Sequence, residues 1–552
     1  MVRDTLASIE QAKYSYGDGC AEIKLALLAR LEHSRLRSAR ALKRLHEVLC
    51  FLRAYPDDPR ILAQVEKMLE GFHRRADLRR HRAALADTGI AGTHIYYRFF
   101  WSTARWLAHR WPDRLALDRS DRESAERIRA ALPLLVTPAE AHWLKEAQVS
   151  AFKALDKLRA PGETDAAFLV RRVHAMNGDS MTREAFFDAI DAAYRLMAGA
   201  GTPSRTHARH PDAPAVFRNE ALRRSRPALD KEISRAPRAV RELSVREGSR
   251  LIDLARGVMV THARDLDAFA YGDPRDVRLV EDSGGLAFMV NGVIPERRAL
   301  MTAMHGFLTL QNGVPIGYGD IDIVARSAAI SFNTFETYRG GEAASIFARL
   351  LAMIRRLFGA DSFSLAPYQL GWKNHEAIAA GAWWFYYKLG FRPQAAEARR
   401  IMREELARMR ADPNHRSERS TLRKLAASHV FYDFDPTRPA GLPPVAALGE
   451  RIARALAQRS RAGREQALKQ CSREAMEITG LRSLKGFNAD ERSAWLRWSP
   501  LIASIPEISG WSRAEKRALV QVVRAKGARC ESDFVARFAA HPKLERALFE
   551  SN

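Results

Sequence analysis

The chain has 552 residues, and at roughly 150 residues per domain this length predicts three or four domains. Hydrophobic residues make up 47% of it and charged residues 28%, which is typical of a globular protein and excludes an intrinsically disordered one. Lysines and arginines number 89 against 65 aspartates and glutamates, so the formal net charge is +24. A surface of this charge attracts polyanions, which makes nucleic acid a candidate partner. Arginine-rich composition explains the charge without a partner, and both interpretations stay open.

Four cysteines, Cys20, Cys50, Cys471 and Cys530, lie far apart near the two ends of the sequence. None belongs to a C-x-x-C pair, so neither a zinc knuckle nor a dithiol redox motif is indicated. We expect free thiols, as in a reducing cytosol. No stretch reaches the ~18 uninterrupted apolar residues of a membrane-spanning helix, and the first residues lack an apolar signal segment. The sequence therefore predicts a cytoplasmic protein without a membrane span.

Residues 1–200 carry apolar side chains at helical spacing and predict an all-helical N-terminal region. Thr137 and Glu140 form a capping box at one helix start. In residues 87–111, aromatic side chains interleave with arginines, and we expect a helix that begins near Gly92 and Thr93. Such a stripe can stack on nucleic-acid bases, although the helical spacing of its aromatics is more typical of core packing.

Periodicity is lost from Gly199 to Pro214, where glycine, proline, serine and histidine gather, and we predict a linker over residues 201–240. Its histidines lack the rigid geometry that a metal site needs.

A domain of a different kind follows at residues 241–436. Between residues 275 and 337 the segments alternate or run apolar, which predicts strands. Breaks at residues 283–285, 291–292 and 312–313, each containing glycine, indicate turns between them. HVFYDFD, from His429, predicts a further strand.

A proline-rich boundary, PTRPAGLPP, lies at residues 436–444. Residues 437–552 predict a basic helical C-terminal region, with capping boxes at Asn488 and Glu491 and at Ser512 and Glu515. The fold class is therefore predicted as α+β, with a central mixed sheet between helical regions.

The stretch 326–358 has the order of a ligand site: a strand, the turn TYRGG, and an amphipathic helix. Gly340 and Gly341 allow a ligand to approach the backbone because they have no Cβ. The helix start behind them offers free N–H groups and the positive end of its dipole to an anion, and Arg339 adds a charged donor. These residues predict a phosphate-binding turn. The helix should place five apolar residues against a sheet: Ile346, Leu350, Leu351, Ile354 and Leu357.

The succession of these segments resembles a known family. YRGGEAA follows a strand, and an amphipathic helix, a second strand, Asn374 and YYKLGF come after it. This order is similar to that of the GNAT-type N-acetyltransferase superfamily, and NGVPIGY, before the strand, is similar to that family's hairpin. The resemblance covers about a third of the chain. It implies a GNAT-like mixed-sheet domain that moves an acyl group from acetyl-CoA or another acyl-CoA to an amine by direct attack.

The resemblance also implies roles for individual residues. Arg339 takes the first position of the coenzyme A motif and Ala344 the last, and Asn374 matches the family's asparagine. Gly340, Gly341 and Ala343 would donate backbone N–H groups to the pyrophosphate.

Three further residues concern the acyl group. The strand backbone around Phe335 would pair with the pantetheine arm. Tyr386 matches the tyrosine that protonates the departing thiolate, and Glu336 lies where many members place a carboxylate that takes the amine proton. A tyrosine suits the first role because it offers a proton at a fixed point.

Glu342 stands where the motif has its first glycine, and the distance from Asn374 to Tyr386 exceeds the family's usual spacing. A carboxylate at the pyrophosphate turn opposes an anion unless it turns away or pairs with Arg339. Two alternatives follow: a non-catalytic GNAT-like scaffold with helical arms for partners, or a basic nucleic-acid-binding protein. The acyl acceptor is not defined by the sequence.

Overall fold

The computed structural model describes residues 2–223, 225–435, 445–459 and 463–549. The chain forms two compact units. Unit 1 consists of residues 1–222, 250–271 and 311–316, and unit 2 of residues 223–249, 272–310 and 317–552. The predicted proline-rich boundary at residues 436–444 lies outside the described residues.

Unit 1 is built mainly of helices. They are α1 (Val2–Ala12), α2 (Cys20–Glu32), α3 (Ala39–Ala54), α4 (Pro59–Glu70), α5 (Ala76–His81), α6 (Trp101–Arg110), α7 (Arg122–Leu135), α8 (Pro138–Ala147), α9 (Ala151–Leu158), α10 (Asp165–His174), α11 (Ser180–Ile190), α14 (Asp267–Ala270) and most of α13 (Val245–Thr261). The capping box at Thr137 and Glu140 is confirmed at the start of α8.

The N-terminal region also contains a small antiparallel sheet, so the prediction of an all-helical region was wrong. Its strands are β1 (Ile95–Tyr97), β2 (Leu115–Leu117) and β3 (Tyr194–Leu196), with β3 in the middle. The helix predicted from Gly92 begins only at Trp101, because residues 95–97 pair with β3. Strands of three residues are too short for alternation to reveal. The aromatics Phe99 and Trp101 are buried in the apolar core around this sheet, which supports the core-packing interpretation.

The first part of the predicted linker is fixed in unit 1. Arg53 of α3, 3% exposed, donates to the carbonyls of Thr206 (2.7 Å), Arg205 (3.1 Å) and Ala208 (3.3 Å). The Thr206 hydroxyl lies 2.9 Å from His46 Nε2. A buried arginine thus satisfies three carbonyls of a segment that has no regular structure of its own.

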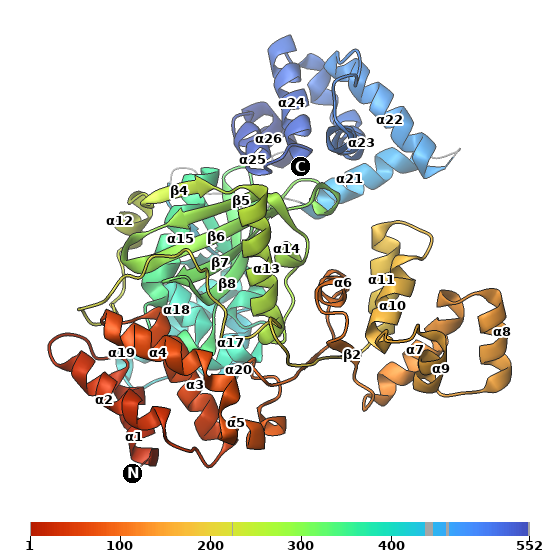
Figure 1. The fold of residues 1–552 in the computed structure, drawn as a ribbon. Helices are drawn as coiled ribbons and strands as arrows, with labels where there is room; N and C mark the ends of the chain where they lie inside the picture. The colour runs from red at the N-terminus through yellow and green to blue at the C-terminus, as the bar shows by residue number, and fades with distance from the viewer. Residues whose placement is uncertain (1, 224, 436–444, 460–462, 550–552) are drawn as a thin grey trace. The chain divides into compact units, whose positions relative to one another are not determined.

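Unit 2 holds a nine-stranded sheet in the order β11-β12-β10-β9-β8-β7-β6-β5-β4 (Figure 1). The sheet is mixed, because β9 and β10 run parallel while the pairs β4–β5, β5–β6, β8–β9, β10–β12 and β11–β12 are antiparallel. The strands are β4 (Ala239–Glu242), β5 (Gly272–Glu281), β6 (Leu286–Val293), β7 (Ala303–Gln311), β8 (Val314–Val324), β9 (Ser327–Thr334), β10 (Ser362–Leu365), β11 (Arg392–Pro393) and β12 (Val430–Asp433). The predicted α+β class with a large mixed sheet is confirmed.

The turns between these strands follow the sequence with one exception. The turn at Asn312 and Gly313 joins β7 to β8, with φ of 50° and 76°, the left-handed pair that a tight hairpin requires. Residues 283–285 form the turn between β5 and β6. The break predicted at Asn291 and Gly292 does not occur, since β6 continues to Val293.

The helices of unit 2 around the sheet are α12 (Leu229–Ser234), α15 (Ala343–Phe358), α16 (Pro367–Leu370), α17 (His375–Ala379), α18 (Ala382–Leu389), α19 (Ala396–Ala411) and α20 (Arg419–Leu425). Of the apolar residues expected to face the sheet from α15, four are buried and Leu357 is half-buried. Arg349 of α15 is also buried, where it donates to Asp282 at 2.6 Å. Figure 1 shows α15 lying across the sheet.

The C-terminal helices form the blue group in Figure 1: α21 (Val445–Ala457), α22 (Arg464–Thr479), α23 (Ala489–Ala503), α24 (Arg513–Lys526), α25 (Ser532–Ala539) and α26 (Pro542–Phe549). Both predicted capping boxes are confirmed, at the starts of α23 and α24.

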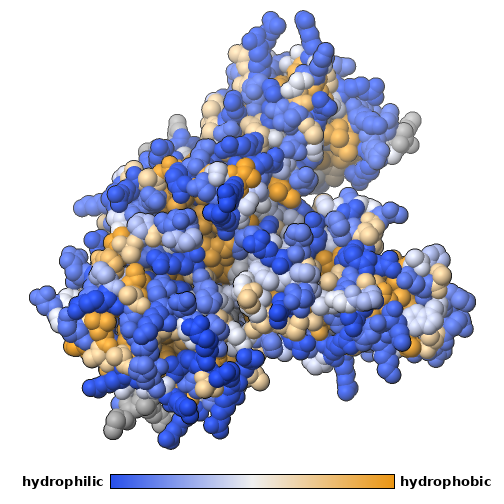
Figure 2. Space-filling model, viewed as in Figure 1, coloured by the Kyte–Doolittle hydropathy of each residue, from blue (hydrophilic) through white to orange (hydrophobic). Residues whose placement is uncertain are grey.

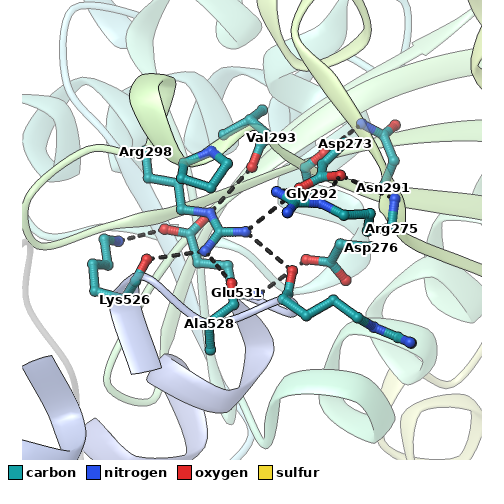
Figure 3. A network of polar contacts seen from close by, with 12 residues as sticks. Asp273, Arg275, Asp276, Asn291, Gly292, Val293, Arg298, Lys526, Ala528 and Glu531 are labelled. Carbon is teal, nitrogen blue, oxygen red and sulfur yellow. Dashed lines mark hydrogen bonds and ion pairs between the residues drawn. The ribbon is translucent and has the colours of Figure 1, made fainter. Parts of the chain in front are cut away.

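A buried polar network fastens these helices to the β6–β7 connection (Figure 3). Arg298, 1% exposed, donates to Lys526 O (2.9 Å), Ala528 O (2.6 Å) and Arg529 O (3.1 Å) at the end of α24. The guanidinium thereby meets the negative end of the helix dipole. Lys526 pairs with Glu531 and donates to Thr302 O at 2.8 Å.

No helix in the described part of the chain is long and apolar enough to cross a membrane. Hydrophilic residues dominate the face of the molecule in Figure 2. All four cysteines are free.

Candidate functional site

The sheet of unit 2 opens between β9 and β10. Ser362, Phe363 and Ser364 of β10 lie opposite Ser327, Ala328 and Ala329 of β9, and the pairing ends there. On its other side β9 stays paired with β8 as far as Thr334. Residues 330–334 therefore present backbone groups on the β10 side that no strand covers. We call this segment the open edge of β9.

Gln369, on α16, fills the middle of the open edge. Its Oε1 accepts from the backbone N–H of Phe332 at 3.3 Å, and its Nε2 donates to the Phe332 carbonyl at 2.6 Å. The side-chain amide thus makes the same pair of hydrogen bonds that a neighbouring strand would make. Buried backbone groups need such partners, and Phe332 is only 6% exposed.

The same nitrogen of Gln369 also donates to the hydroxyl of Tyr386, at 2.8 Å. Tyr386, on α18, is buried, and its ring packs edge-on against Phe347 of α15 with centroids 5.3 Å apart. Burial raises the pKa of Tyr386, and the Gln369 hydrogen bond opposes that shift. The phenol is therefore neutral at ordinary pH and keeps its proton for donation. Gln369 therefore contacts both Tyr386 and the open edge of β9. The sequence alone could not show that these two features lie close together.

The turn after β9 holds the next group of predicted site residues. Phe335 is buried and stacks on Tyr318, with ring centroids 5.4 Å apart. Glu336 follows in a 3-10 turn, η5 (Glu336–Tyr338), and its side chain is exposed. Gly340 has a φ of 84°, a left-handed conformation that a side chain would strain. Within the turn the Gly341 N–H donates to Tyr338 O at 3.3 Å.

Arg339 links this turn to α17. Its guanidinium donates to Thr334 O at 3.2 Å and pairs with Glu376 in the first turn of α17. Both side chains of the pair are almost half exposed, so the pair adds little to stability. A guanidinium held so loosely can be drawn to an anion at the turn.

The first turn of α15 contains Ala343 and Ala344, and the residue before the helix is Glu342. The Glu342 side chain makes no capping bond to the helix. Its Oε1 instead accepts from the backbone N–H of Arg223, at 3.0 Å. The carboxylate is thus turned toward residue 223, while the N–H groups at the start of this 16-residue helix remain the positive end of its dipole.

Asn374 acts as a helix cap. Its Oδ1 accepts from the N–H of Ala377 at 3.1 Å, and its Nδ2 donates to Tyr368 O at 3.2 Å. One polar group caps α17 and the other bonds to α16, so the structure does not bring this side chain to the open edge.

Two carboxylates on β8 were not singled out from the sequence. Asp320 lies opposite Ser331 and Asp322 opposite Ala329, on the sheet face that looks away from α15, because Phe332 packs on Phe347 of that helix. Asp322 is exposed. The surrounding protein nevertheless raises its pKa to about 6, and the charges of Asp320 and Glu531 add to this. The alternation in GYGDIDIV was the available signal, since it sets both carboxylates on one face next to β9.

Comparison of the chain with models of known protein families, with curated proteins and with solved structures gives no match.

Proposed function

We propose that the protein is an acyl-CoA-dependent N-acyltransferase of the GNAT type. One observation carries the proposal: a strand with an open edge leads through a glycine turn into a long helix, and a parallel strand follows that diverges from the first. This is the segment order on which the resemblance rests. β12, from the segment HVFYDFD, lies beside β10, where a last strand of such a domain is expected.

The residues of the site fit the parts of an acyl-CoA. The N–H groups of Gly340 and the first turn of α15, with Arg339 close by, would bind the pyrophosphate. The Gly341 N–H would join them only by giving up its hydrogen bond to Tyr338 O, at 3.3 Å. The open edge of β9 would pair with the amides of the pantetheine arm. Glu342 is the one group that opposes this fit, and its hydrogen bond to Arg223 turns it away from the helix start.

We assign the steps of this reaction to the residues of the site. The acceptor nitrogen attacks the thioester carbonyl, the C–S bond breaks, and the sulfur leaves as a thiol. Tyr386 would donate its hydroxyl proton toward the developing charge on sulfur. Because its pKa is raised, the phenol acts first as a hydrogen-bond donor and transfers the proton only as that charge grows. Asp322 or Glu336 would take the proton that the amine loses.

Calorimetric titration with acetyl-CoA and longer acyl-CoA at low salt tests the proposal. We expect saturable binding, followed by acyl transfer to amines in a screen. A protein that gives no heat with any acyl-CoA would leave the alternative of a scaffold without cofactor binding. The free cysteines fit a reducing compartment, and we place the activity in the cytoplasm.

A second candidate function, polyanion binding, is favoured by one segment of unit 1. Residues 73–82 around α5 contain four exposed arginines for which no acidic partner occurs among the described residues: Arg74, Arg79, Arg80 and Arg82. Replacing all four by glutamine should weaken RNA binding and flatten its salt dependence, since each phosphate contact contributes to the slope. Arg60 is the matched control, because Asp58 and Glu22 already pair with it. Equal salt slopes for the wild type and the fourfold variant would reject this candidate.

A further inference from the structure

The carboxamide of Gln369 takes the place of two successive peptide groups of an extended chain. It meets both the N–H and the carbonyl of Phe332, which only one orientation of a side-chain amide permits. β10 has already ended its pairing at Ala329, so no strand competes for this position. Gln369 therefore occupies the place on the open edge that the amides of a ligand would need.

Gln369 is also placed to leave that position. Its side chain is only partly buried, and its neighbours Tyr368 and Trp372 are 63% and 44% exposed. The backbone around it is held firmly, with Trp372 N–H donating to Pro367 O at 2.9 Å. A rotation of the glutamine side chain alone can thus uncover Phe332 without disturbing the core.

Withdrawal of Gln369 changes Tyr386 at the same time. One nitrogen, Nε2, serves both the Phe332 carbonyl and the Tyr386 hydroxyl, so the two hydrogen bonds are lost together. In the closed state the tyrosine oxygen accepts from Gln369. In the open state the Tyr386 hydroxyl loses this hydrogen bond and can interact with a ligand at the open edge.

From these contacts we propose that Gln369 is an exchangeable internal ligand of the open edge, displaced by the two amides of the pantetheine arm when acyl-CoA binds. The inference rests on the proposed function and adds a gate to it. When the pantetheine arm fills the open edge, it displaces Gln369 and thereby frees the Tyr386 hydroxyl from its hydrogen bond to Gln369. The gate favours thioesters whose arm carries two amides, because a trans amide presents its N–H and its carbonyl to opposite sides and two amides are needed to restore both hydrogen bonds of Phe332.

The test compares Gln369→Leu with the wild type, using Gln394→Leu as the matched control because Gln394 is exposed. Coenzyme A binding is measured by calorimetry, and hydrogen exchange is followed by mass spectrometry in a peptide that covers residues 330–335. Without ligand, this peptide should exchange faster in Gln369→Leu than in the other two proteins. Coenzyme A should restore its protection. The variant should also bind about tenfold more tightly, the factor expected if Gln369 covers the edge in about nine of ten molecules.

Each result decides between the proposals. If the wild type binds coenzyme A and Gln369→Leu binds equally or more weakly, the gate is overturned while the proposed function stands. If none of the proteins binds, both fail. Should the leucine variant not fold, Gln369→Glu replaces it, since a carboxylate cannot donate to the Phe332 carbonyl. Acyl transfer gives a further readout: a gate predicts a lower KM with little change in kcat, whereas a residue that merely positions Tyr386 would lower kcat.

Discussion

Glu342 and Arg223 are joined by a hydrogen bond of 3.0 Å between the glutamate Oε1 and the arginine backbone N–H. The contact connects the residue before α15 with the segment that leads into α12, across 119 positions of the chain. It explains how a carboxylate is accommodated at the turn without capping the helix. The negative charge nevertheless stays next to a helix start, where it competes with any anion that binds there.

Replacing Glu342 by glutamine should therefore strengthen coenzyme A binding. Glutamine keeps an oxygen that can accept from Arg223 but removes the charge. Two like unit charges ~4 Å apart repel each other by about 1 kcal/mol in water. Removing the glutamate charge should therefore raise the affinity for the phosphate about fivefold. Calorimetry checks this, with Glu404→Gln on the exposed face of α19 as the control. An unchanged affinity would mean that Glu342 does not act on the phosphate site.

Tyr386→Phe should slow acyl transfer while leaving the fold intact. Phenylalanine keeps the ring contact with Phe347 but loses the proton and the hydrogen bond from Gln369. We expect kcat to fall by about 10²-fold with a small change in KM. The loss of one hydrogen bond should cost about 1 kcal/mol of unfolding free energy. Steady-state kinetics and urea unfolding measure the two effects separately, and full turnover in the variant would exclude Tyr386 as the proton donor.

Much of the nine-stranded sheet could be predicted because its signals are local. Period-two alternation marks the strands, and the left-handed pair Asn312 and Gly313 marks a hairpin whatever surrounds it. Asn291 and Gly292 misled for the same reason. This dipeptide favours a turn in isolation, yet here β6 continues through it to Val293, and the irregularity falls on β5, where the register shifts between Gly272 and Val277. Tertiary pairing overrode a local preference.

The site was predictable only where its residues lie next to one another in the sequence. Phe335, Glu336 and Arg339 follow directly from a strand, a turn and a helix. Gln369 belongs to no pattern, and its contact with Phe332 spans 37 residues. Its position depends on where β10 diverges from β9. Asn374 is the reverse case. A motif match assigned it to the cofactor, but in the structure its side chain caps a helix.

Asp322 provides a pH-dependent test of the proton acceptor. If Asp322 takes the amine proton, activity should rise with pH through about 6, the value to which its pKa is raised. Asp322→Asn should abolish this rise of activity with pH. Asp320→Asn should shift the rise to lower pH, because it removes a like charge that raises the pKa of Asp322. A pH profile that is the same in the wild type and Asp322→Asn would leave Glu336 as the candidate.

The same shift predicts the effect of Asp322 on stability. Its folded-state pKa lies above the ordinary value of 3.8, so the folded protein binds this proton more tightly than the unfolded chain. Stability is therefore lost as the pH rises from about 4 to about 6, and the loss is complete above that range. Asp322→Asn should be more stable than the wild type at pH 8, and the difference should vanish below about pH 4. Urea unfolding at the two pH values measures it, and a destabilised variant at pH 8 would contradict the assignment.

The pair of Lys526 and Glu531 should be essential to the attachment of the C-terminal helices. Both side chains are almost fully buried, and burial lowers the pKa of Lys526 and raises that of Glu531, so each charge depends on the other. Lys526→Met leaves a carboxylate buried without its partner, which should cost about 3–5 kcal/mol of unfolding free energy.

The double variant Lys526→Met with Glu531→Leu should recover part of that loss, because it removes both charges and leaves apolar side chains of similar size. Arg529 and Glu242 supply the control, since they form an exposed ion pair at 3.0 Å whose loss should cost less than about 1 kcal/mol. A double-mutant cycle in urea measures the coupling. If Lys526→Met costs no more than Arg529→Gln, then Arg298 and its carbonyl contacts hold the C-terminal helices without help from the buried pair.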